Sequence, residues 1–157
     1  MSARQHTVLV LGLGNDILGD DAVGLHAARE LGKEFQRKAD IVEAAVSGFE
    51  IMEILEGYEK VLLIDAVVTN RHRPGTILEL TKEQFRNVVA ISPHYMGLPD
   101  VFLLAEKMNV EFPTEICILG MEIMPPYELR EELSPDIRSA LPELISKGKD
   151  VLSRWTA

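Results

Sequence analysis

The chain has 157 residues, of which 46% are hydrophobic and 26% charged, a balance typical of one globular domain with its own core. Its 16 basic and 25 acidic residues give a net charge of −9, which disfavours nucleic acid and anionic lipid as partners. No apolar stretch reaches the ~18 residues of a membrane-spanning helix, and the polar first residues do not resemble a signal peptide. The single cysteine, Cys117, excludes an internal disulfide. We therefore expect a single domain, residues 1–157, in the cytoplasm.

Five short stretches rich in apolar and β-branched residues alternate with helical patterns. The predicted strands are residues 7–12, 40–45, 60–66, 76–80 and 115–120. The predicted helices are residues 20–32, 49–55, about 98–108, and 135 to about 155, the last with Ser134 as N-cap and Pro135 at its first position. This alternation predicts a mainly parallel, twisted sheet covered by helices on both faces. Ligands bind such sheets beyond the carboxyl ends of the strands, so a site is expected there.

The loop after the first strand, residues 12–21, is rich in glycine and ends in two acids, Asp20 and Asp21. It matches neither nucleotide-binding pattern. Ile17 stands where a dinucleotide site needs glycine, and the two acids replace the Lys and Ser/Thr of a P-loop. The two acids could be an N-cap and a first-turn acid of the next helix, each stabilising it by less than ~1 kcal/mol, or one of them could face a cation. The spacing alone leaves both interpretations open.

Two further polar residues are expected near this loop. Asp65 ends the most apolar strand, and His94 follows Pro93 in a loop. If the first and third strands are neighbours, the Asp65 carboxylate emerges beside the glycine-rich loop. Two carboxylates and one imidazole suit a divalent transition metal with open positions, whereas calcium or magnesium favours more oxygen ligands. Taken singly, a strand-end Asp is more often a turn cap, and a loop histidine is more often a surface residue.

Three blocks of the sequence together resemble the hydrogenase maturation endopeptidases. They are residues 12–15 with 19–21 and Gly24, residues 63–66, and residues 92–98. The blocks have the order and separation of that family over nearly the whole chain. The resemblance implies a three-layer αβα sandwich in which Asp21, Asp65 and His94 bind nickel. Some members of the family carry Glu at the position of Asp21.

The resemblance also implies an activity, a partner and a metal. The activity is removal of a C-terminal extension from the large-subunit precursor of a nickel–iron hydrogenase after nickel insertion. The nickel is carried by the substrate, and no nucleotide is expected. Asp21 or Asp65 is a candidate general base, and Gly14 and Asn15 are candidates for contact with the substrate chain. We expect a monomer, and residues 121–135 are a further hypothesis for partner specificity.

Three other interpretations remain open at this point. The chain could be a metallohydrolase with a permanently bound zinc or nickel. It could be a non-catalytic metal-binding module or chaperone with a flavodoxin-like fold. In the third interpretation the two acids are helix caps and His94 is a surface residue, which predicts small stability changes on substitution and nothing else.

Overall fold

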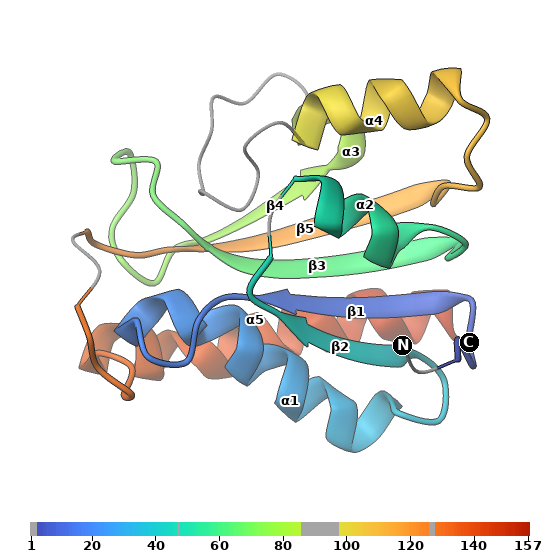
Figure 1. Cartoon of the computed structure of the whole chain (residues 1–157). Coiled ribbons are helices and arrows are strands. Elements are labelled where there is room, and N and C mark those ends of the chain that lie inside the picture. Colours follow the sequence, from blue (N-terminus) through green and yellow to red (C-terminus); the bar gives the residue numbers. More distant parts are fainter. Residues whose placement is uncertain (1–2, 47, 86–97, 126–127) are drawn as a thin grey trace.

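A five-stranded sheet forms the centre of the computed structural model, which describes residues 3–46, 48–85, 98–125 and 128–157. The strands are β1 (Val8–Leu13), β2 (Asp40–Ala44), β3 (Lys60–Val67), β4 (Ile77–Thr81) and β5 (Glu115–Glu122). Their order in the sheet is β2-β1-β3-β5-β4, and β4 alone among them runs antiparallel to its neighbour (Figure 1). The predicted mainly parallel sheet is therefore confirmed, with each predicted strand within two residues of the observed one.

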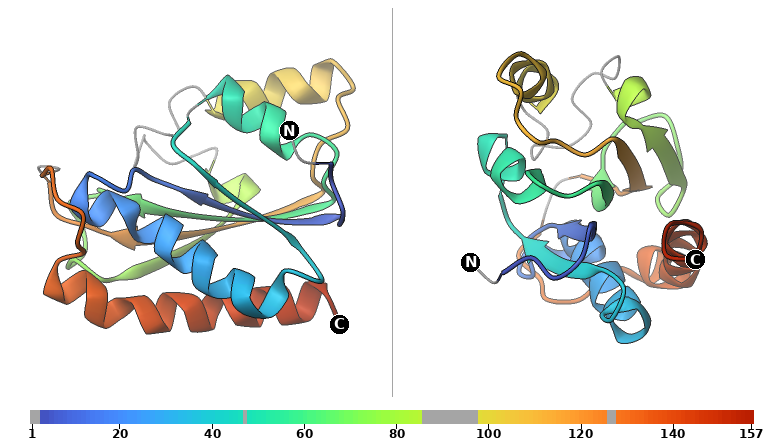
Figure 2. Two further views of the ribbon diagram at one scale, coloured as in Figure 1. Left: turned by 60° about the horizontal axis from the view of Figure 1, so that its bottom comes forward. Right: turned by 90° about the vertical axis from the view of Figure 1, so that its right-hand side faces the viewer.

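Helices cover both faces of this sheet, as the alternating pattern predicts (Figure 2). One face carries α1 (Val23–Phe35) and α5 (Pro135–Trp155), and the other carries α2 (Phe49–Leu55), α3 (Lys82–Phe85) and α4 (Leu98–Lys107). The short helix α3 was not predicted. The first helix begins later than predicted because a 3₁₀ turn, η1 (Gly19–Ala22), precedes α1. The three-layer αβα sandwich is confirmed.

Separate apolar clusters hold the two helical layers to the sheet. Leu31 of α1 and Leu144 of α5 pack with β3 residues such as Leu62 on one face. Leu55 of α2 and Phe102 of α4 pack with Leu63 on the other. Every residue of β1 is buried, which explains its continuous apolar sequence. No helix in the described part of the chain is both long and apolar enough to cross a membrane.

The start of α1 lies directly against the backbones of β1 and β3. A Cβ atom placed on Gly24 would lie 2.3 Å from the Ile64 carbonyl oxygen and 2.6 Å from that of Leu13. A Cβ atom on Gly12 would lie 2.5 Å from the Gly24 carbonyl oxygen. These distances are too short for any side chain, so glycine is required for the helix to begin this close to the carboxyl ends of the strands.

Replacing Gly24 with alanine tests this packing. The added methyl group would meet backbone atoms that cannot move independently, so we expect the free energy of unfolding to fall by about 1–3 kcal/mol. The matched control is Gly32→Ala in the same helix, where the new Cβ would lie 3.4 Å from Ile41 Cγ1, an ordinary contact. That variant should be neutral or more stable by up to about 1 kcal/mol. Urea unfolding measures both, and equal stability of the two variants would contradict the packing argument.

Candidate active site

Three acidic side chains are buried in the described part of the chain, and all three lie at the carboxyl end of a parallel strand. Asp21 is 5% exposed and sits in η1 after β1, while Asp65 is 0% exposed and is the third residue from the end of β3. Glu122 is 2% exposed and is the last residue of β5. Since β1, β3 and β5 are successive neighbours in the sheet, these carboxylates gather at one edge.

Asp21 is carried to this edge by the close packing of the first helix. Gly12 of β1 pairs with Ile64 of β3, which confirms the predicted adjacency of the first and third strands. The 3₁₀ turn that contains Asp21 contacts β3, and the backbone of Gly24 approaches Ile64, the residue immediately before Asp65. The structure therefore brings the turn that carries Asp21 against the strand that carries Asp65.

Asp65 faces the layer formed by α2 and α4. Side chains alternate between the two faces of a strand, and Leu63 and Val67 belong to the core on that side. The Oδ1 atom of Asp65 accepts a hydrogen bond of 2.8 Å from the backbone N–H of Ala66. In the parallel pairing of β3 with β5, the residue opposite Asp65 is Gly120, which has no side chain to place next to the carboxylate. The strand itself continues to Val67, one residue beyond the predicted end at residue 66.

His94, the third member of the predicted set, lies outside the described residues. The described chain ends at α3 before it and resumes at α4 after it, and α4 lies on the face toward which Asp65 points. Within the described ranges no three His, Cys, Asp or Glu side chains form a group suited to a metal ion. Metal binding by Asp21, Asp65 and His94 thus stays a prediction.

Asp20 and Asp21 are adjacent in sequence but have different surroundings. Asp20 accepts two hydrogen bonds from Ser134, 2.7 Å from its backbone N–H and 2.8 Å from its hydroxyl, across 114 residues of chain. The N-cap of η1 is Leu18 and that of α1 is Ala22, and no side chain caps either of them, so the interpretation of one acid as an N-cap is wrong. Both acids do lie in the first turn of η1, as the other half of that interpretation requires. Ser134 is at the predicted N-cap of α5, but its hydroxyl donates to Asp20 instead of capping the helix.

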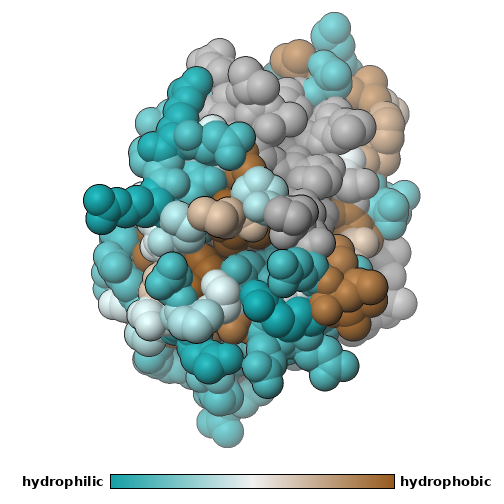
Figure 3. Space-filling view, turned by 90° about the vertical axis from the view of Figure 1, so that its left-hand side faces the viewer, coloured by the Kyte–Doolittle hydropathy of each residue, from teal (hydrophilic) through white to brown (hydrophobic). Residues whose placement is uncertain are grey.

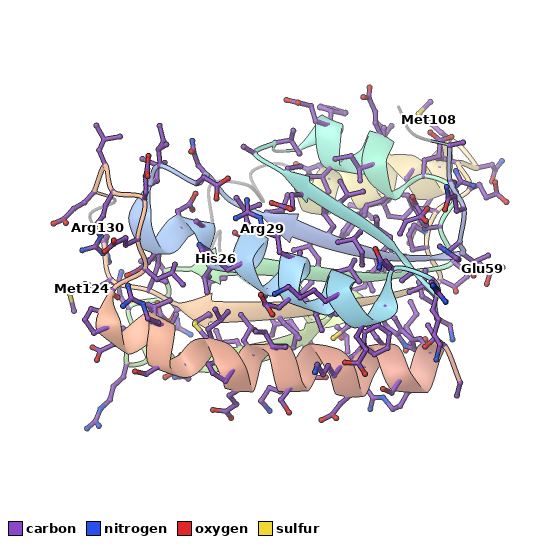
Figure 4. The ribbon with its side chains drawn as sticks, turned by 90° about the horizontal axis from the view of Figure 1, so that it is seen from below. His26, Arg29, Glu59, Met108, Met124 and Arg130 are labelled. Atoms are coloured by element: carbon purple, nitrogen blue, oxygen red, sulfur yellow. The ribbon has the colours of Figure 1, made fainter. Side chains whose placement is uncertain are left out.

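The glycine-rich loop is fixed by hydrogen bonds to β2 and α1. The N–H of Gly14 donates to the Ala44 carbonyl at 3.1 Å, and the side chain of Asn15 accepts from the N–H of Ile17 at 3.1 Å. Arg29, which projects from α1 (Figure 4), donates to Asp16 of the loop at 2.8 Å and to Glu43 of β2 at 2.7 Å.

A hollow of about 380 Å³ lies beside Gly14 and Asn15. Both residues therefore border open space, as contact with a substrate chain requires. Because the Gly14 N–H is already paired, such contact would use the other polar groups of this loop. The role of Gly14 and Asn15 in substrate binding stays a prediction.

Glu122 is a residue of this edge that the sequence did not reveal. Its carboxylate accepts hydrogen bonds from both the N–H and the hydroxyl of Thr69, the former at 2.8 Å, and so holds the loop that follows Asp65. The predicted strand ends at Gly120, and Glu122 falls in the segment 121–135 for which the sequence offers only the hypothesis of partner specificity, whereas β5 continues to Glu122. The available signal was a single acid after an apolar strand, which does not distinguish a buried carboxylate from an exposed one.

Cys117 is unsuited to be a nucleophile. It lies on β5 in the half-buried position expected of a structural cysteine, with its Sγ atom 3.8 Å from a carboxylate oxygen of Glu79. Burial, reinforced by the negative charge of Glu79, raises the pKa of the Cys117 thiol to about 12. A neutral thiol is a poor nucleophile and a poor metal ligand.

Fold and site together define an αβα protein with a cluster of buried acids at the carboxyl edge of its sheet. Residues 25–150 match the family model described as hydrogenase maturation protease, which is most of the chain. The chain belongs to the hydrogenase maturation protease family. The resemblance inferred from the three sequence blocks is thereby confirmed.

Known relatives cover nearly the full chain. The hydrogenase 2 maturation protease of Escherichia coli is 27% identical over 94% of this chain and 96% of its own length. The hydrogenase expression/formation protein HoxM of Cupriavidus necator is 24% identical over 94% of this chain and 75% of its own length. Among solved structures, the hydrogenase maturating endopeptidase HybD from Escherichia coli superposes with a TM-score of 0.79 at 25% identity, covering 94% of this chain and 92% of that one. A [NiFe] hydrogenase maturation protease from Thermococcus kodakarensis shares the fold, with a TM-score of 0.72 at 24% identity over 92% and 98% of the two chains.

The reactivity of Cys117 tests whether this protease uses a cysteine nucleophile. At pH 8 a thiol with a pKa of about 9 is roughly one-tenth ionised, whereas one with a pKa of about 12 is roughly one ten-thousandth ionised. We expect iodoacetamide to label folded Cys117 at least about a hundredfold more slowly than the same cysteine in guanidinium-unfolded protein. Labelling of the folded protein should accelerate as the pH rises, because the thiolate fraction increases. Rapid labelling of the folded protein at pH 8 would show that this thiol is activated.

Proposed function

We propose that this protein is the endopeptidase that removes the C-terminal extension of a nickel–iron hydrogenase large-subunit precursor after nickel insertion. Membership of the hydrogenase maturation protease family supports the activity and the class of substrate. The single observation that carries the proposal is the pair of buried carboxylates, Asp21 and Asp65, at the carboxyl ends of neighbouring strands.

The burial of these acids gives a physical reason for metal recognition. Moving a carboxylate out of water costs several kcal/mol, which hydrogen bonds, ion pairs and bound cations can offset, and a cation also stabilises the ionised form that serves as a ligand. In our proposal the cation is the nickel ion already held by the precursor, and Asp21, Asp65 and His94 bind it together. Carboxylate and imidazole ligands suit a divalent transition metal and leave positions for ligands from the precursor.

This arrangement would act as a checkpoint on nickel insertion. A precursor that lacks the metal offers no charge to the buried carboxylates and binds too weakly to be cut. The nickel therefore belongs to the substrate, and the protease needs no metal of its own for the recognition step.

The two carboxylates would contribute differently to cleavage. Nickel in place can polarise the scissile carbonyl or an attacking water. Asp21 is 5% exposed and Asp65 is 0% exposed, so Asp21 is the better placed of the two to accept a proton from an incoming water. We assign Asp65 the task of holding the metal, because its position in β3 is fixed by pairing to β1 and β5.

Neutralising each carboxylate tests the proposal. Asp65→Asn and Asp21→Asn should each lower the rate of cleavage of nickel-loaded precursor at least about a hundredfold, since each removes a metal ligand without changing the size of the side chain. The matched control is Asp150→Asn, an exposed acid of α5 far from this edge, which should cleave at the wild-type rate. Mass spectrometry of nickel-loaded and nickel-free precursor gives the extent of cleavage.

The outcomes separate the competing functions. Wild-type cleavage of the loaded precursor only, lost in both site variants, is the expected result. Equal cleavage of loaded and nickel-free precursor would refute metal recognition while keeping the peptidase. Binding of the loaded precursor without any cleavage would refute the peptidase and favour a non-catalytic metal-binding module. Stoichiometric zinc or nickel in the purified protein would instead favour a metallohydrolase with a resident ion.

A further inference from the structure

A second hollow lies at the carboxyl edge of the sheet, on the side of α5. Its volume is about 330 Å³, within the range of small ligand pockets. The segments that border it follow the three neighbouring parallel strands β1, β3 and β5. Its lining includes Leu18, Asp20, Pro74, Met124, Arg130 and Ser134.

The segment after β5 is fastened to the glycine-rich loop along one wall of this hollow. The N–H of Gly19 donates to the Arg130 carbonyl at 2.7 Å, and the N–H of Arg130 donates to the Ile17 carbonyl at 2.9 Å. The two hydrogen bonds from Ser134 to Asp20 extend this connection to the residue next to Asp21. The hollow is therefore continuous with the turn that carries a candidate active-site acid.

Large apolar side chains are exposed on both of these connected segments. Ile17 is 52% exposed, Met124 67% and Leu129 81%, the last being the most exposed large hydrophobic residue in the described chain. Figure 3 shows this end of the molecule, where apolar surface lies among hydrophilic surface, and Figure 4 places Met124 and Arg130 near the start of α5. Clustered exposed apolar side chains rimmed by polar groups mark interaction surfaces.

The charges around the hollow restrict what can bind. Three acids, Asp20, Glu128 and Asp136, line it against one base, Arg130. The guanidinium of Arg130 is 3.9 Å from a carboxylate oxygen of Glu128, so the positive charge of Arg130 is already partly balanced. An acidic segment would be repelled both here and by the net charge of −9 of the whole chain.

We propose that this hollow and the exposed apolar side chains on the segments that border it (Ile17, Met124 and Leu129, here called the apolar rim) form the docking surface for a neutral or basic extended segment of the precursor that presents an apolar side chain. The inference rests on the proposed function, since the precursor is its occupant. Docking here would place the precursor chain across the glycine-rich loop and beside Asp21. It would also explain how the protease selects its own precursor, because the nickel ion is the same in every such substrate.

Replacing rim residues tests the docking surface separately from the chemistry. The variant is Ile17→Ser with Leu129→Ser, and the probe is nickel-loaded large-subunit precursor. The matched control is Leu103→Ser with Met108→Ser on and after α4, with side chains 46% and 62% exposed. Met108 lies at the opposite end of the molecule from Met124 (Figure 4). Precursor binding by biolayer interferometry and cleavage by mass spectrometry are measured on the same samples.

We expect the rim variant to bind the precursor at least about tenfold more weakly, with KM for cleavage raised and kcat within about twofold of the wild type. The control should match the wild type in both. Wild-type binding by the rim variant would overturn the docking surface and leave the peptidase intact. A wild type that binds without cleaving, with binding lost in the rim variant, would overturn the peptidase and support the docking surface. Unchanged precursor binding with a change in self-association on sedimentation would overturn the proposal in favour of a contact between copies of this chain.

Discussion

The close backbone contact between the start of α1 and the strands β1 and β3 is the constraint on which the rest of the edge depends. At Gly12 and Gly24 there is no room for a Cβ atom, and the obstructing atoms are backbone carbonyls of neighbouring elements. This contact lets the chain turn from β1 into a helix within a few residues. The 3₁₀ turn between them consequently crosses the carboxyl edge of the sheet, and Asp21 is buried there beside β3.

The loop that crosses this edge is held by contacts with α1, with β2 and with the segment before α5. Arg29 ties it to β2 through paired carboxylates, and the backbone of Arg130 and the side chain of Ser134 tie it to the segment before α5. On β5, Glu122 holds the loop that follows Asp65 by accepting a hydrogen bond from the N–H of Thr69. Charged and polar groups that form hydrogen bonds at the edge of a sheet hold the loops in place, but burying them costs desolvation energy. Their concentration at this edge is typical of a functional site, where the positions of side chains matter more than stability.

Membership of the hydrogenase maturation protease family gives this edge a chemical context. In our proposals, the buried acids bind the nickel ion of the precursor, and the neighbouring hollow binds the polypeptide that carries this ion. At the edge that the glycine-rich loop crosses, Asp65 and this hollow lie toward opposite faces of the sheet, because Asp65 faces the α2 and α4 layer and the hollow lies beside the start of α5. A precursor chain that reached both would have to pass over that loop, which would couple recognition of the metal to recognition of the protein that carries it.

The sequence by itself determined the element types, their order and the layered fold, since apolar periodicity, glycine and proline act locally. Three short motifs in register also indicated the family. Only the tertiary structure decided that β4 runs antiparallel beside β5, and that Asp20 bonds to Ser134 while Asp21 is buried. It also decided that Glu122 is a buried carboxylate and that the segment after β5 borders the hollow beside the glycine-rich loop. These features depend on contacts between residues far apart in the chain. Asp20 and Asp21 are identical and adjacent, so the sequence around them does not show which of them bonds to Ser134 and which is buried.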